Sequence, residues 1–316
     1  MTKNKLLIGG LIGFSIACLL SAPYFGAADY SEQIHDLRMP RAFLAWICGG
    51  ALAVAGLLLQ SLLRNDLATP FTLGVASSAS FGSFLCVAMP ALAFTIWLPQ
   101  LMGFGFALLT LLIILRLTTS RLGSNGILLV GITLNFIFGA ALMIIRHLAP
   151  PYRLTKLEHW LMGSIETSSY QPSTLIAAIS VVCLFFAWRL RSSLDQYSFD
   201  VSVAEARGVN PNKLLRGGLI ISGLLTASVV SQCGPISFIG LLVPHMLRPF
   251  IGYSHALMIC GCWLLGSGFL VLADTLSRSL LIFGTSSDIP VGIITATIGG
   301  PVFLTIILRK SVRTAH

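Results

Sequence analysis

The sequence predicts an all-α protein that crosses a lipid bilayer about ten times. Hydrophobic residues make up 55% of the 316 residues, and Asp, Glu, Lys and Arg together make up only 10%. The mean hydropathy is +0.88. Soluble domains contain about a quarter charged residues, so this chain lacks the side chains that would cover a water-facing surface. Apolar runs of membrane-spanning length also follow one another along the whole chain, which favours a polytopic membrane protein.

Each apolar run is predicted to be a helix, because backbone polar groups inside a bilayer must be satisfied within the protein, and about 20 helical residues cross the hydrocarbon. We treat 1–316 as a single transmembrane domain. The run at 236–251 is short and contains Pro244 and His245, so a broken or re-entrant segment is the alternative there. In chain order the ten runs are 5–25, 41–63, 71–90, 92–117, 124–147, 172–190, 214–233, 236–251, 256–282 and 289–309.

The distribution of basic residues supports an even number of spans with both termini in the cytoplasm. Cytoplasmic loops carry an excess of Lys and Arg, and this topology places 14 of the 20 basic residues on that side. The six on the opposite side are Arg38, Arg41, Arg146, Arg153, Lys156 and Arg278. The alternative is a signal peptide cleaved near Ala27-Ala28. That would leave nine spans.

Composition and motifs exclude several classes of function. The net charge of +9 is dispersed between apolar runs, which is not typical of a nucleic-acid surface. The chain contains no HExxH, GxSxG or Walker motif, so neither an intramembrane hydrolase nor an ATPase is indicated. Its seven cysteines lack a CxxC pair and are interpreted as packing residues. We expect no cofactor and no metal site, and we interpret the histidines as satisfied helix residues.

Ionisable groups at membrane depth are scarce. Asp274 and Arg278 stand four residues apart, which favours an ion pair on one helix face, either functional or a partly solvated helix-end bridge. A proton-coupled secondary carrier would contain more buried carboxylates. Energy for uphill transport would therefore come from a partner protein.

Small residues and one loop carry further information. Glycine and alanine recur through 49–56, and small residues four apart allow helices to approach closely. The loop at about 192–213 contains Ala204–Arg207, which predicts a short helix stopped by Gly208 and followed by a turn at Asn210-Pro211. Such a helix would serve either as a lever for a cytosolic partner or as an ordinary connector.

An ordered series of motifs resembles one family. The segments are LRMPR at 37–41, GxxLxxxGxxxQ at 49–60, RNDLATPFTLG at 64–74, WLMGS at 160–164, GPISFIGLLVPH at 234–245, Ala273-Asp274 with Arg278, Pro290-Val291-Gly292 and GPVF at 300–303. The chain is similar in these segments to the permease subunit of FecCD-type, or type II, ATP-binding-cassette importers for ferric siderophores, haem and cobalamin.

The resemblance implies partners as well as a fold. It implies ten helices per subunit, a second permease copy or paralogue, two copies of a cytosolic ABC ATPase, and an extracytoplasmic substrate-binding protein at the bacterial inner membrane. No nucleic acid is involved. It further implies alternating access without chemistry in this subunit, with a ferric siderophore as first choice because it is the family's commonest cargo. Haem or cobalamin is the alternative. A metal-ion ABC permease or an ion-coupled carrier ranks lower.

The resemblance also implies roles for particular residues. Arg38, Arg41 and Arg278 match arginines that dock the binding protein, since guanidinium groups pair well with carboxylates. Asn65 and Leu67 match the cytoplasmic gate turn, and Ala204, Arg207 and Gly208 match the helix that contacts the ATPase. Two positions depart from the pattern. Asp66 replaces a proline, which predicts a less rigid gate, and Arg207 stands where an apolar residue is common.

Overall fold

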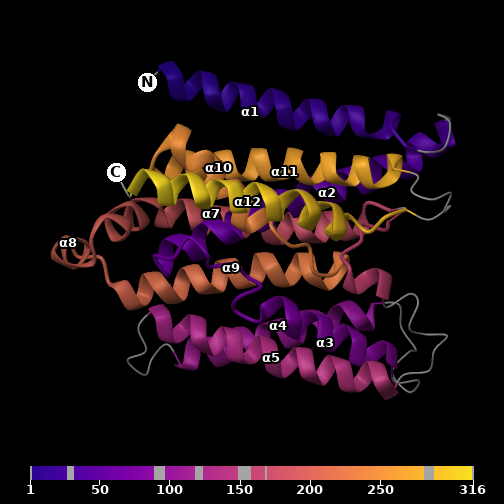
Figure 1. Cartoon of the computed structure of the whole chain (residues 1–316), viewed down its shortest axis with the longest axis horizontal. Helices are drawn as coiled ribbons and strands as arrows, with labels where there is room; N and C mark the ends of the chain where they lie inside the picture. The colour runs from indigo at the N-terminus through magenta and orange to yellow at the C-terminus, as the bar shows by residue number, and fades with distance from the viewer. Residues whose placement is uncertain are drawn as a thin grey trace.

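The structure is a computed structural model that describes residues 2–26, 32–88, 97–117, 124–148, 158–167, 169–280 and 288–314. Within these ranges it consists of helices and turns and contains no strand, which confirms the predicted all-α class. The long helices lie roughly side by side in one elongated bundle (Figure 1). The start of α1, the end of α12 and the short helix α8 lie at the same end of the bundle (Figure 1).

The helices follow one another with short connections. Their bounds are α1 Thr2–Ser21, the 3-10 turn η1 Ala22–Tyr24, α2 Glu32–Leu62, α3 Val75–Ala88, α4 Leu98–Leu117, α5 Ser124–Leu148, α7 Gln171–Phe199, α8 Val201–Ala206, α9 Pro211–Cys233, α10 Ile239–Ile251, α11 His255–Ser279 and α12 Val291–Thr314.

Each of the ten predicted apolar runs coincides with one helix, so the ten-helix architecture is confirmed. Seven of these helices are long and apolar enough to cross a membrane, and α3, α10 and α12 supply shorter apolar stretches. The count of ten full crossings is therefore approximate. The short α10 has 13 residues and spans about 20 Å at 1.5 Å per residue, which agrees with the alternative considered for 236–251, a broken or re-entrant segment. The first residues of the run predicted at 92–117 lie outside the described residues.

Helix α2 forms the centre of the bundle. It packs against α7, α9, α10 and α11, and 89% of its most apolar stretch consists of buried residues. Helices α3, α4 and α5 pack together along one edge, where α3 and α4 contact α9, whereas α1 lies along the opposite edge against α11 (Figure 1). All seven cysteines are free, and all except the partly exposed Cys260 are buried, which confirms their interpretation as packing residues.

The predicted close approach of small residues is confirmed along α2. A Cβ atom on Gly49 would lie 2.2 Å from the carbonyl oxygen of Gly266 in α11. A Cβ atom on Gly56 would lie 1.9 Å from the carbonyl oxygen of Gly240 in α10. Backbone therefore touches backbone at both positions, and any larger side chain would push the helices apart.

Substitution of Gly56 by alanine is expected to lower the thermal stability of the protein. The added methyl group overlaps the backbone of α10, and overpacking of this kind costs about 1–3 kcal/mol. Gly105→Ala is the matched control, because a Cβ atom on Gly105 of α4 meets nothing within 4 Å. The measurement is the apparent melting temperature of detergent-solubilised protein by gel filtration. A Gly56→Ala variant that melts no lower than the control would contradict this packing argument.

Candidate functional site

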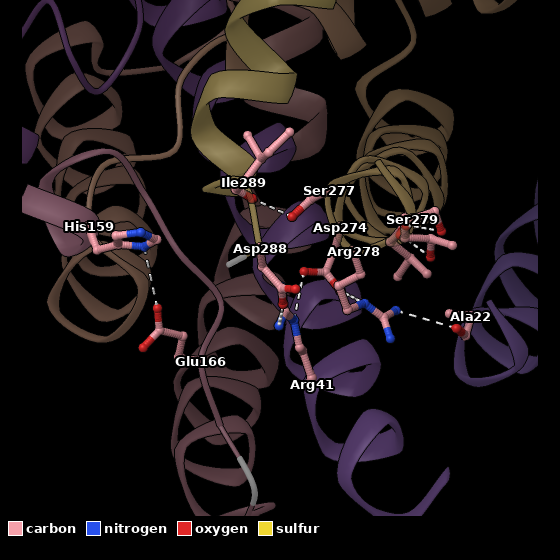
Figure 2. Close-up of polar contacts among 12 residues, drawn as sticks. Ala22, Arg41, His159, Glu166, Asp274, Ser277, Arg278, Ser279, Asp288 and Ile289 are labelled. Carbon is pink, nitrogen blue, oxygen red and sulfur yellow. Dashed lines mark hydrogen bonds and ion pairs between the residues drawn. The ribbon is translucent and has the colours of Figure 1, made fainter. Parts of the chain in front are cut away.

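Charged side chains gather at the predicted outer end of the bundle, where α2 begins and α11 ends (Figure 2). Arg41 of α2 donates from Nε to Oδ1 of Asp274 at 2.9 Å and from Nη1 to Oδ2 of Asp288 at 2.7 Å. The Asp274 side chain, on α11, is 1% exposed. The Asp288 side chain, in the non-helical segment before α12, is 50% exposed. Arg41 therefore connects three elements through one buried and one solvent-facing carboxylate.

Arg278 shares the buried carboxylate with Arg41. Its Nε lies 3.1 Å from Oδ2 of Asp274, which confirms the ion pair predicted from the four-residue spacing. The two atoms are close enough for ionic attraction but are not aligned as a hydrogen bond. Nη2 of Arg278 also donates to the carbonyl oxygen of Ala22 at 3.3 Å (Figure 2). Arg278 is thus a buried residue that holds the turn η1 against α11.

Arg38 also contacts the turn after α1. Its Nη1 donates to the carbonyl oxygen of Pro23 at 3.1 Å, and the residue is buried. The guanidinium lies over Gly26, where a Cβ atom would come within 2.5 Å of Nη2. Of the three arginines predicted to dock a binding protein, Arg41 is partly exposed, whereas Arg38 and Arg278 are buried. Their docking role stays a prediction.

A hollow of about 290 Å³ lies beside Arg41 and is lined by Asp288, His159 and Glu166, among others. Nδ1 of His159 lies 3.8 Å from Oε1 of Glu166, whose side chain is 70% exposed. The hollow therefore gives a partner side chain room to approach Arg41. Its rim carries two exposed carboxylates.

At the opposite, predicted cytoplasmic end, the turn after α2 holds the predicted gate residues. Arg64 adopts φ +48°, and the amide of Asn65 donates to the carbonyl oxygen of Gln60 at 3.1 Å, which ends the helix. Oδ1 of Asn65 accepts a hydrogen bond from the amide of Leu67 at 2.8 Å. The Asn65 side chain thus closes the turn and leaves Leu67 exposed.

Asp66, which stands in place of the usual proline, forms an ion pair with Arg248 of α10. Nη2 of Arg248 donates to Oε1 of Gln60 at 2.9 Å, and Nε2 of Gln60 donates to the carbonyl oxygen of Gly240 at 3.1 Å. The sequence predicted a less rigid turn, because Asp66 replaces a proline. The structure differs from this prediction, because the Asp66 carboxylate pairs with Arg248 and holds the turn against α10. The Asp66–Arg248 pair was not predicted, because its only signal in the sequence is one acidic and one basic residue at the ends of two helices far apart along the chain.

His255 connects three helices near this turn. Its amide nitrogen and Nδ1 each lie 2.7 Å from Oδ1 of Asp195 in α7, and its Nε2 lies 2.7 Å from Oγ of Ser61 in α2. The ring is buried, so this histidine is satisfied within the helices, as we expected. No sequence pattern indicates these partners, because they lie far from His255 along the chain. A hollow of about 210 Å³ adjoins His255 and the Asp66–Arg248 pair.

The short helix α8 has its own capping signals. Oδ1 of Asp200 accepts hydrogen bonds from the amides of Ser202 at 2.7 Å and Val203 at 3.2 Å. The hydrogen bond from the Ser202 hydroxyl, followed by those from the two amides, lowers the pKa of Asp200. This cap explains why the helix begins at Val201, three residues before the predicted start.

The predicted stop of α8 at glycine is confirmed. Gly208 adopts φ +83°, and the amide of Val209 donates back to the carbonyl oxygen of Ala204 at 3.0 Å. Ala204 is buried, whereas Arg207 and Gly208 are exposed. The helix is therefore seated on the bundle through Ala204 and presents Arg207 to its surroundings.

Membrane-length helices, charge clusters at both ends and a short exposed connecting helix define a multi-pass membrane protein. The chain belongs to the FecCD transport family, which it matches over residues 5–309. It is thus an ABC importer permease, a class in which the ATPase is a separate subunit. Among the described residues, no group of three or more His, Cys, Asp or Glu side chains could hold a metal ion.

Similar proteins cover nearly the whole chain. The hemin transport system permease protein HmuU of Yersinia pestis is 34% identical over 87% of this chain and 83% of its own. The vitamin B12 import system permease protein BtuC of Salmonella typhi is 31% identical over 88% and 84%. A solved structure described as an inward-facing metal-chelate type ABC transporter has a TM-score of 0.87, 26% identity and coverage of 96% and 99%.

Replacement of Asp274 by asparagine is expected to destabilise the permease strongly. It leaves Arg41 and Arg278 without their buried counter-charge, and breaking one side of a buried ion pair costs about 3–5 kcal/mol. The measurement is the melting temperature in detergent. Asp36→Asn is the control, since the Asp36 side chain is 87% exposed. Adding Arg278→Met to Asp274→Asn should restore part of the stability. A double variant as unstable as the single one would contradict this electrostatic account.

Proposed function

We propose that this chain is the transmembrane subunit of an importer that carries a metal chelate, with a ferric siderophore as first choice, from a binding protein into the cytoplasm. The observation that carries this proposal is the likeness over 96% of the chain to a metal-chelate type ABC transporter. Haem and cobalamin are the alternative cargoes, because relatives named for hemin and vitamin B12 transport are about one-third identical to the chain.

The orientation follows from charge and from the arrangement of the helices. The charge rule gives a topology in which 14 of the 20 basic residues lie in the cytoplasm, including Arg207 just after α8 and the basic residues of both termini. The start of α1, the end of α12 and α8 share one end of the bundle, which agrees with an even number of crossings (Figure 1). We assign this end to the cytoplasmic side of the inner membrane.

A cytosolic ATPase would act through α8. Ala204 seats α8 on the bundle, and α8 contacts α7 and α9, so a force on its exposed residues reaches both of those helices. On α7, Asp195 binds His255 of α11, which in turn binds Ser61 of α2, just before the gate turn. This series of contacts gives a physical route from ATP hydrolysis in the partner to Asn65 and Leu67. Two permease copies, or this chain and a paralogue, would open one gate at a time.

The binding protein would dock at the other end. Arg41 offers a partly exposed guanidinium next to a hollow, and Arg38 and Arg278 add positive charge within the same cluster. A carboxylate on the binding protein would find a charge-assisted contact at this position. The chelate would then be released at the outer end of the bundle.

The proposed function is tested by uptake into proteoliposomes. The permease is reconstituted with its ATPase and a candidate binding protein, and iron-labelled hydroxamate and catecholate chelates are compared with haem and cobalamin. We expect iron-chelate uptake that requires ATP and both partners. If haem or cobalamin is taken up and the hydroxamate and catecholate chelates are not, that compound replaces the ferric siderophore as the proposed cargo. Uptake by the permease alone under a proton gradient would contradict the proposal and support an ion-coupled carrier.

Reversal of the charge at Arg207 is expected to weaken assembly with the ATPase. The side chain lies exposed at the end of α8, where a partner groove would contact it. For Arg207→Glu we expect a roughly 3- to 10-fold weaker association, the scale of one or two exposed charge contacts. Arg216→Glu on α9 makes the same charge change at another exposed position and serves as control. If both variants change co-purification with the ATPase equally, the assignment of α8 to the ATPase interface is wrong.

A further inference from the structure

We propose that Asp288 occupies Arg41 in the undocked permease and gives way to a carboxylate of the binding protein when that protein docks. The inference rests on the docking role of Arg41 in the proposed function. It adds an internal competitor, because the Asp288 carboxylate of the permease and an acidic side chain of the binding protein would compete for Arg41. Docking would then be an exchange of one carboxylate for another on the same guanidinium.

The two carboxylates on Arg41 differ in the way that such an exchange requires. Asp274 is 1% exposed, stands within a helix and is shared with Arg278, so its removal would strand two buried cations. Asp288 is 50% exposed, and its hydrogen bond with Arg41 is exposed to solvent. An exposed ion pair changes an equilibrium constant by only about 1.5- to 5-fold, so a second carboxylate can compete with it.

The surroundings of Asp288 allow its side chain to move while its backbone stays in place. The hydroxyl of Ser277, on α11, donates to the carbonyl oxygen of the next residue, Ile289 (Figure 2). This hydrogen bond holds the segment before α12 against α11, so Asp288 can release Arg41 by rotation of its side chain. The hollow of about 290 Å³ that Arg41 and Asp288 both line gives an incoming acidic side chain access to the same atoms.

Repulsion between carboxylates favours exchange over simple addition. A third carboxylate added at Arg41 would lie beside the exposed carboxylate of Asp288 and be repelled by it. If Asp288 turns away, the incoming carboxylate takes its place at Nη1 and the charge of the cluster is unchanged.

The first test uses chemical labelling and needs no partner. The permease in proteoliposomes is treated with p-hydroxyphenylglyoxal, which modifies accessible arginines, and the rate at Arg41 is measured by mass spectrometry. We expect Asp288→Asn and Asp288→Ala to raise this rate by about 2- to 5-fold. Asp36→Asn removes a more exposed outer negative charge on α2 and should leave the rate unchanged. Unchanged labelling of Arg41 in both Asp288 variants would overturn the proposal.

The second test measures docking of the binding protein that the uptake assay identifies. At low salt, Asp288→Asn should tighten its association with the assembled transporter by about 2- to 5-fold, and Arg41→Glu should weaken it. If Arg41→Glu has no effect, the docking assignment fails. If Arg41→Glu weakens docking while Asp288→Asn weakens it or leaves it unchanged, docking stands and the exchange is refuted. Asp36→Asn again measures the general effect of removing a negative charge.

Discussion

Close packing around the central helix α2 is the constraint on which the rest of this permease depends. Gly49 and Gly56 let α11 and α10 approach its backbone, and the apolar stretch between the helix ends is almost completely buried. A helix enclosed in this way cannot bend or slide independently of its neighbours. Its two ends carry the proposed docking residue Arg41 and the proposed gate turn, so one rigid element fixes both sites relative to each other.

Charge is confined to the two ends of this rigid element. At one end, Asp274 pairs with both Arg41 and Arg278, and at the other, Arg248 joins Asp66 to Gln60. The middle of the bundle between them is lined by apolar and small residues, as the bilayer requires. This separation suits the proposed conduit, because each proposed partner would meet a polar contact surface, while the described middle of α2, residues 42–62, contains no Asp, Glu, Lys or Arg.

The sequence predicted the fold well and the contacts less well. Helix positions follow from apolar runs and capping residues, which are local properties, so the ten helices and the stop of α8 at Gly208 were foreseen. The ion pair of Asp274 with Arg278 was also foreseen, because four-residue spacing places both on one helix face. The contacts of Arg41 with Asp274, and of His255 with Ser61, join residues roughly two hundred positions apart. Only tertiary packing determines such contacts, and no periodicity in the chain encodes them.

The short length of α10 has a consequence for solvent. The segment at 234–238 has no helical hydrogen-bond ladder, although it lies within the bundle beside Leu52 and Gly56 of α2. Peptide groups without such a ladder are tolerated at membrane depth only where they meet other protein groups or water. A hollow of about 150 Å³ adjoins this segment, bounded by Thr69, Phe71 and Phe238 among others. Water in this hollow would make an otherwise apolar part of the bundle locally polar, at a depth that the proposed cargo would pass.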